Sequence, residues 1–105
     1  MDTVYEGTTS YLTVSFFDKA GAAAAPSAAT WLCHDVHSGT VLKEETALEG
    51  VAASVEITIP PSVNTMVDQY AQQEQHRVTV VASYGADDQV TAMYDFLVTG
   101  LRQVT

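Results

Sequence analysis

The stretch Ala53-Ser54-Val55-Glu56-Ile57-Thr58-Ile59 decides the fold class of this chain. Its apolar residues stand at every second position and alternate with polar ones. Successive side chains of a strand point to opposite faces, so this period of two predicts a β-strand with one buried face. Pro60 and Pro61 follow at once and end the strand, because proline donates no hydrogen bond to a ladder.

The same alternation recurs along most of the chain. It predicts strands at residues 3–5, 11–17, 30–36, 41–45, 53–59, 77–84 and 92–98. The charged stretch Val41–Glu45 is expected at a sheet edge, where charges discourage pairing with other chains. About seven short strands at regular spacing, with turn residues between them, are typical of a sandwich or barrel. The sequence therefore predicts an all-β fold, an Ig-like antiparallel β-sandwich that forms a single domain over residues 1–105.

Two segments depart from this rhythm. Residues 20–29 are rich in alanine but contain Pro26 and no amphipathic stripe, so a loop is expected there. Between Ser62 and Gln75, apolar residues fall at helical spacing: Val63, Met66, Val67 and Tyr70. A short helical segment is therefore predicted near residues 62–70, after Pro61. Tyr70 is also a candidate for the tyrosine corner of Ig-like sandwiches.

The composition limits the classes of partner. Hydrophobic residues make up 47% of the chain and charged residues 16%, which favours a folded domain over a disordered one. Only 4 basic residues stand against 13 acidic ones, and the basic ones are scattered. Nucleic acids and anionic membranes attract clustered Lys and Arg, so neither is an expected partner. Neither a signal peptide nor a membrane-spanning segment is expected, and the protein is predicted to be made in a cytoplasm and to be soluble.

Cys33 is the single cysteine, so no disulfide can form within the chain. It lies in an apolar run beside Trp31 and is expected to act as a small buried hydrophobic residue.

Histidines near one predicted strand are the first candidates for metal ligands: His34 and His37, with Asp35 between them. Ligands on one strand share a face only at i and i+2, whereas these histidines are three residues apart. His76 would add a third ligand if its strand lay beside this one. The spacing is far from that of known zinc sites, so the sequence predicts no metal and no cofactor.

The carboxylates of the chain give little indication of a calcium site or a catalytic site. Asp87-Asp88 with Asp95 lack the oxygen spacing of a calcium loop, and aspartates are expected in turns. Glu44-Glu45 lie on the predicted edge strand and not in a pocket. The chain contains no Gly-x-Ser-x-Gly elbow and no phosphate-binding glycine loop. No catalytic residue is therefore predicted, and an enzyme is not expected.

The aromatic residues favour packing over binding. Trp31 stands near the third predicted strand, where Ig-like sandwiches hold a core tryptophan, although an exposed tryptophan would suit sugar stacking. Tyr5, Tyr11, Tyr94 and Phe96 are likewise expected in the core or at its rim.

Several runs along the chain resemble small virion proteins of tailed bacteriophages. The likeness covers most of the chain and rests on these stretches: Asp18–Gly21, Thr30–Asp35, Ser38-Gly39, Val41-Leu42, Val55–Pro60, Asn64–Met66, Glu74–Val80 and Tyr94–Leu101. These are strand and turn motifs, and they carry over no functional residue. The alanine tract and the Gln-rich segment Gln69–Gln75 depart from the pattern.

The resemblance implies an Ig-like module repeated on a virus particle. The leading expectation is a capsid decoration or cement protein that stabilises the head, and a tail or baseplate component is the first alternative. The implied partners are a major capsid protein or tail and baseplate proteins, together with copies of itself. The implied location is the virion, after synthesis in the host bacterial cytoplasm. A carbohydrate- or surface-binding module is the alternative from another class.

Overall fold

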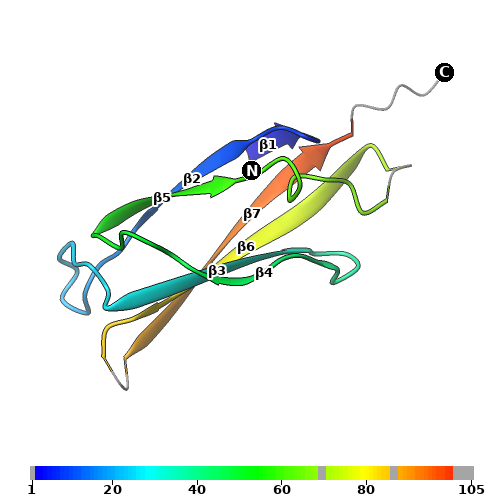
Figure 1. Ribbon diagram of the computed structural model, residues 1–105. Coiled ribbons are helices and arrows are strands. Elements are labelled where there is room, and N and C mark those ends of the chain that lie inside the picture. The colour runs from blue at the N-terminus through cyan, green and yellow to red at the C-terminus, as the bar shows by residue number, and fades with distance from the viewer. Residues whose placement is uncertain (1, 69–70, 86–87, 101–105) are drawn as a thin grey trace.

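A computed structural model describes residues 2–68, 71–85 and 88–100 of the chain, and within them the fold is all-β (Figure 1). Seven strands follow one another: β1 (Asp2–Tyr5), β2 (Ser10–Ser15), β3 (Ala28–Asp35), β4 (Val41–Ala47), β5 (Ser54–Ile59), β6 (Gln73–Ser83) and β7 (Gln89–Thr99). Each predicted strand is confirmed. The predicted loop between β2 and β3 is confirmed as well, although β3 already begins at Ala28.

The strands form two sheets that face each other. One sheet has five strands in the order β1-β7-β6-β3-β4, and the other pairs β2 with β5. The expectation of purely antiparallel pairing is wrong, because β1 runs parallel to β7 with Asp2 opposite Phe96. The larger sheet is therefore mixed, and β4 lies at its edge as the charges of that strand predicted.

The predicted helix near residues 62–70 is also wrong, since no helix occurs in the described part of the chain. One turn does form, in which the N–H groups of Val63 and Asn64 both donate to the Pro60 carbonyl, at 3.0 and 3.2 Å. A helix would need the next N–H groups to continue this pattern. Three and four residues after Asn64, the N–H groups of Val67 and Asp68 donate instead to the carboxylate of Glu74. Tyr70, the tyrosine-corner candidate, lies outside the described residues.

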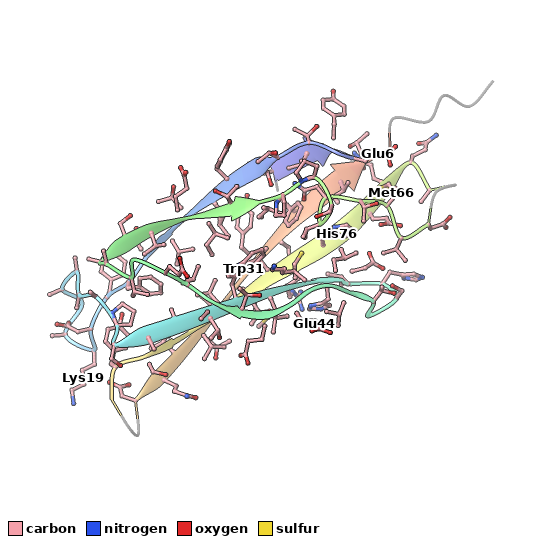
Figure 2. The ribbon with its side chains drawn as sticks, viewed as in Figure 1. Glu6, Lys19, Trp31, Glu44, Met66 and His76 are labelled. Carbon is pink, nitrogen blue, oxygen red and sulfur yellow. The ribbon has the colours of Figure 1, made fainter. Side chains whose placement is uncertain are left out.

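One core fills the space between the sheets. Phe16, Ile57 and Ile59 approach it from the β2–β5 side, and the larger sheet contributes residues that include Val78 and Phe96. Figure 2 shows Trp31 and His76 between the sheets, while Lys19 and Glu44 point outward. No helix in the described ranges has the length and apolar character needed to cross a bilayer.

Candidate metal centre

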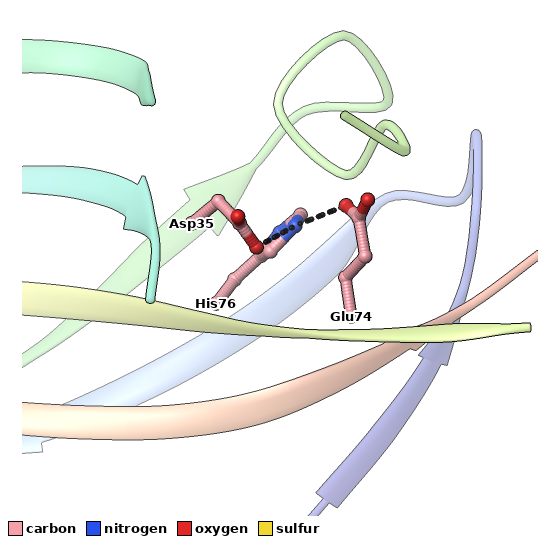
Figure 3. Close-up of side chains that lie close together, drawn as sticks. All are labelled: Asp35, Glu74 and His76. Atoms are coloured by element: carbon pink, nitrogen blue, oxygen red, sulfur yellow. Dashed lines mark hydrogen bonds and ion pairs between the residues drawn. The ribbon is translucent and has the colours of Figure 1, made fainter. Parts of the chain in front are cut away.

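Three ionisable side chains meet where β3 ends beside the start of β6. Asp35 and His76 are cross-strand partners in the β3–β6 ladder. Glu74 precedes His76 by two residues and therefore shares its face of β6. Figure 3 shows the imidazole of His76 between the two carboxylates.

All three side chains are withdrawn from solvent. His76 is 0% exposed, Asp35 3% and Glu74 9%. His76 Nε2 lies 3.1 Å from Glu74 Oε1 and 3.8 Å from Asp35 Oδ1. The His76–Glu74 distance is that of a hydrogen bond, whereas the His76–Asp35 distance is too long for one. The rings of His76 and Phe96 pack in a T-shaped arrangement, with centroids 5.8 Å apart.

Backbone groups hold Glu74 in place. The Val67 N–H donates to Glu74 Oε1 at 2.8 Å, and the Asp68 N–H donates to Oε2. Because both oxygens accept hydrogen bonds from amides, the side chain is arranged as a carboxylate. The segment before β6 is thus tied to the same side chain that faces His76.

The β3–β4 hairpin holds Asp35 in a similar way. Its Oδ2 accepts hydrogen bonds from the Ser38 N–H at 2.9 Å and from Ser38 Oγ at 2.7 Å. Gly39, with φ of 76°, supplies the left-handed turn that closes this loop. Burial by itself would raise the pKa of Asp35, but the Ser38 hydrogen bonds and the charges of His76 and His37 together lower the pKa below its usual range.

Two atoms of this cluster have no hydrogen-bond partner among the described residues: Asp35 Oδ1 and His76 Nδ1. Buried polar atoms nearly always have a hydrogen-bond partner in native proteins, so these two unpaired atoms need an explanation. Asp35 Oδ1 is the atom that points toward Nε2 of His76, at the centre of the cluster.

A pocket of about 200 Å³ opens beside the cluster. Asp35 and Glu74 line it together with His37, Ser38 and Asp68, whereas His76 lies behind them. The two carboxylates can therefore be reached from the pocket although they are almost fully covered.

The structure separates the histidines that the sequence placed together. His34 is half-buried on the opposite face of β3 from Asp35, and His37 is exposed in the hairpin loop. His76 does lie on the neighbouring strand, which was the condition set for its taking part. Sequence reasoning missed Glu74. Its signal was the i, i+2 spacing from His76, in phase with the apolar residues Val78 and Val80.

The other candidate carboxylates remain apart from this cluster. Asp95 binds Arg77 through two hydrogen bonds and has no described contact with Asp88, while Asp87 lies outside the described residues. Glu44 and Glu45 are exposed on β4, as predicted, and Glu45 Oε2 accepts a hydrogen bond from Thr30.

The predictions for the aromatic residues are confirmed for some and wrong for others. Trp31 is in the core at 6% exposure and Phe96 at 2%, both as predicted, and Tyr94 is half-buried at the rim. The prediction was wrong for Tyr5 and Tyr11, which are 59% and 65% exposed. Cys33 is fully buried, as expected.

Comparison with known proteins gives no relative: no family model, no curated protein and no solved structure matches this chain. Function must therefore be argued from the cluster, the sheet edges and the surface.

Proposed function

We infer that this chain is a non-catalytic structural protein of a tailed-bacteriophage virion, which decorates and stabilises the capsid by receiving an extended segment of a capsid subunit. The observation that carries this proposal is an apolar groove between two unpaired strand edges. The phage setting rests on the sequence resemblance alone. We infer too that the two sheets are a variant of the Ig-like sandwich, which the core position of Trp31 on the third strand supports.

The groove runs between β2 and the first half of β7, and we call it the β2/β7 groove. Two adjoining pockets of about 200 and 150 Å³ form it and share Val14, Ser15, Val80 and Ala92. Its remaining lining residues carry no charge: Leu12, Thr13, Phe16, Phe17, Val78, Ala82, Tyr84, Val90, Met93 and Tyr94. Several of them are exposed apolar side chains, including Phe17 at 55% and Met93 at 63%.

Both walls of the groove have a free backbone edge in the described part of the chain. Among the described strands, β2 pairs only with β5. β7 pairs with β6 along its whole length, but with β1 only from Phe96 to Thr99. Gln89–Asp95 therefore presents an unpaired edge of seven residues, about 23 Å at the usual rise of a strand.

An unpaired strand edge beside an apolar groove suits strand addition. In this mode main-chain hydrogen bonds give affinity, and alternate side chains of the partner fill pockets. The partner would lie in line with β1 and carry small apolar side chains at every second position. The net charge of −9 makes a second copy of this chain a poor occupant and favours a segment with basic flanks.

The cluster around His76 supports a non-catalytic role. His76 is fully buried and does not line the adjacent pocket, so a substrate there could not reach its ring. The Ser38 hydroxyl in that pocket donates to Asp35 rather than to an imidazole, so it lacks the base that activates a serine nucleophile.

The test is binding of the purified protein to phage particles, measured by co-sedimentation and located by cryo-electron microscopy. Ala92→Glu places a charge in the groove at an exposed position and should abolish co-sedimentation. The matched control is Thr91→Glu, an equally exposed neighbour on the other face of β7, which should bind like the wild type.

Absence of the wild-type protein from particles would refute the virion proposal, and retention on host envelope polysaccharide instead would favour a surface-binding module. Equal binding by both variants would show that the groove is not the contact. Density on the tail rather than the head would favour a tail or baseplate component.

A further inference from the structure

We propose that Asp35, Glu74 and His76 form a binding site for one divalent transition-metal ion of the zinc type, through Asp35 Oδ1, Glu74 Oε1 and His76 Nε2. This site goes beyond the proposed assembly role and does not depend on it.

The positions of the donor atoms fit a single ion. One ligand atom from each of the three residues lies within 4.8 Å of the other two, and His76 Nε2 is 3.1 Å from Glu74 Oε1 and 3.8 Å from Asp35 Oδ1. Tetrahedral zinc with ligands at about 2.0–2.1 Å sets its donor atoms about 3.3 Å apart. Closing the site would therefore shorten the separations between donor atoms by up to about 1.5 Å.

The charges of the donor groups match a divalent ion. Asp35 and Glu74 are both arranged as carboxylates by the donors that hold them. A divalent ion bound by two carboxylates and a neutral imidazole would bring the charge of the cluster to zero.

The unpartnered oxygen gives a separate line of support. Asp35 is buried, with 3% of its surface exposed. Its Oδ1 points at the centre of the cluster and has no hydrogen-bond partner among the described residues. A metal ion there would satisfy this atom. The other oxygens of the two carboxylates are already held by Ser38 and Asp68, as second-sphere groups hold the ligands of known metal sites.

The ligand types and the pocket narrow the choice of ion. Imidazole is a poor ligand for calcium and magnesium, which prefer oxygen, whereas zinc, cobalt and manganese accept a mixed set of this kind. The pocket lined by Asp35 and Glu74 gives an entry path for the ion.

The first experiment uses chelator-treated full-length protein and zinc chloride. Titration calorimetry should show one Zn²⁺ per chain, and the melting temperature should rise by about 10 °C when free zinc is a hundred times the dissociation constant. Calcium and magnesium should give neither effect. Absence of zinc binding by the wild-type protein would overturn the proposal and leave the cluster as a hydrogen-bonded network.

The second experiment identifies the ligands without disturbing the core. The chain has three histidines, so His34→Gln/His37→Gln leaves His76 as the single imidazole. This double variant should bind zinc like the wild type. With Co²⁺ in place of zinc, its visible spectrum should be typical of nitrogen and oxygen ligands. Loss of binding in it would show that the accessible histidines hold the metal and would refute the site.

The third experiment uses Asp35→Asn. This variant keeps the shape of the side chain and should weaken zinc binding at least tenfold. Its matched control is Asp95→Asn, a carboxylate on β7 outside the cluster, which should leave zinc binding unchanged. Circular dichroism would verify that both are folded. Equal affinity of Asp35→Asn and the wild type would overturn the assignment of Asp35 as a ligand.

Discussion

Arg77 and Asp95 form a two-point pair across the β6–β7 ladder. Arg77 Nε donates to Asp95 Oδ1 at 2.7 Å, and Arg77 Nη2 donates to Oδ2 at 2.9 Å. The two residues are direct cross-strand partners, and Gln75 adds a third hydrogen bond to the same carboxylate. Arg77 alternates with His76 along β6, so the pair lies on the face of the sheet that points away from the buried cluster.

We expect this pair to make stability depend on acid pH. The Arg77 hydrogen bonds, with help from Gln75 and against the effect of burial, lower the pKa of Asp95. A lowered carboxylate pKa stabilises the fold above the unfolded value of about 3.9, and this contribution is lost as the pH falls through the folded value. The stability difference between the wild type and Asp95→Asn, measured by urea unfolding, should therefore be larger at pH 7 than at pH 3.

A double-mutant cycle with Arg77→Gln and Asp95→Asn should give a coupling energy of about 0.5–1 kcal/mol at pH 7, because the pair is partly exposed. Glu56→Gln, at an exposed position of β5 in the other sheet, is the control and should give no coupling when it is combined with Arg77→Gln. A coupling near zero would mean that the pair adds nothing to stability.

Trp31 should dominate the stability of the core. It is 6% exposed between the sheets, and Lys43 Nζ lies 5.9 Å from its ring centroid on the other strand of the hairpin. Trp31→Ala should reduce the free energy of unfolding by about 3–5 kcal/mol, because a large buried side chain leaves a cavity. Tyr11→Ala removes an aromatic ring that is 65% exposed and should cost less than about 1 kcal/mol. A Trp31 variant with an unchanged melting temperature would contradict the core assignment.

Much of the fold could be predicted because burial on one face imposes a period of two. That rule located β5 and the apolar parts of β6 and β7, and it placed Trp31 and Cys33 on the inner face. The same rule failed at the start of β6, where the inward positions hold Glu74 and His76 instead of apolar residues. Polar residues at inward positions hide a strand from a hydrophobicity pattern.

The errors beyond β6 depend on contacts between distant segments. The apolar spacing after Pro61 suited a helix, but the Glu74 carboxylate takes the N–H groups of Val67 and Asp68. Nothing local to β1 shows that it lies parallel to β7. The cluster could be anticipated only in part for a similar reason: the sequence named Asp35 and His76 as candidates, but they are 41 positions apart and only the β3–β6 register makes them neighbours.

Cys33 should be inert in the folded protein. Its side chain is fully buried, and this burial raises the pKa of the thiol to about 12. The thiolate is the reactive form, so both access and ionisation are suppressed. Ellman's reagent at pH 8 should label less than one thiol in ten over the time in which urea-unfolded protein reacts completely. Rapid labelling of the native protein would show that the core opens readily or that Cys33 is misplaced.

Tyr94 should link the docking of β1 to alkaline pH. Burial, followed by the hydrogen bond and the charge of Asp2, raises the pKa of Tyr94 to about 12. For an acid with a raised pKa, the contribution to stability is complete below the unfolded value of about 10 and disappears as the pH rises through the folded value. The free energy of unfolding should therefore fall between pH 10 and pH 12 more steeply for the wild type than for Tyr94→Phe. Asp2→Asn keeps the phenol but removes the charge, so its loss of stability should begin at the same pH, be smaller in total and end at a lower pH than that of the wild type. If the wild type and Tyr94→Phe lose stability in parallel over this range, the Tyr94 hydroxyl has no special environment and β1 is not held to β7 by this bond.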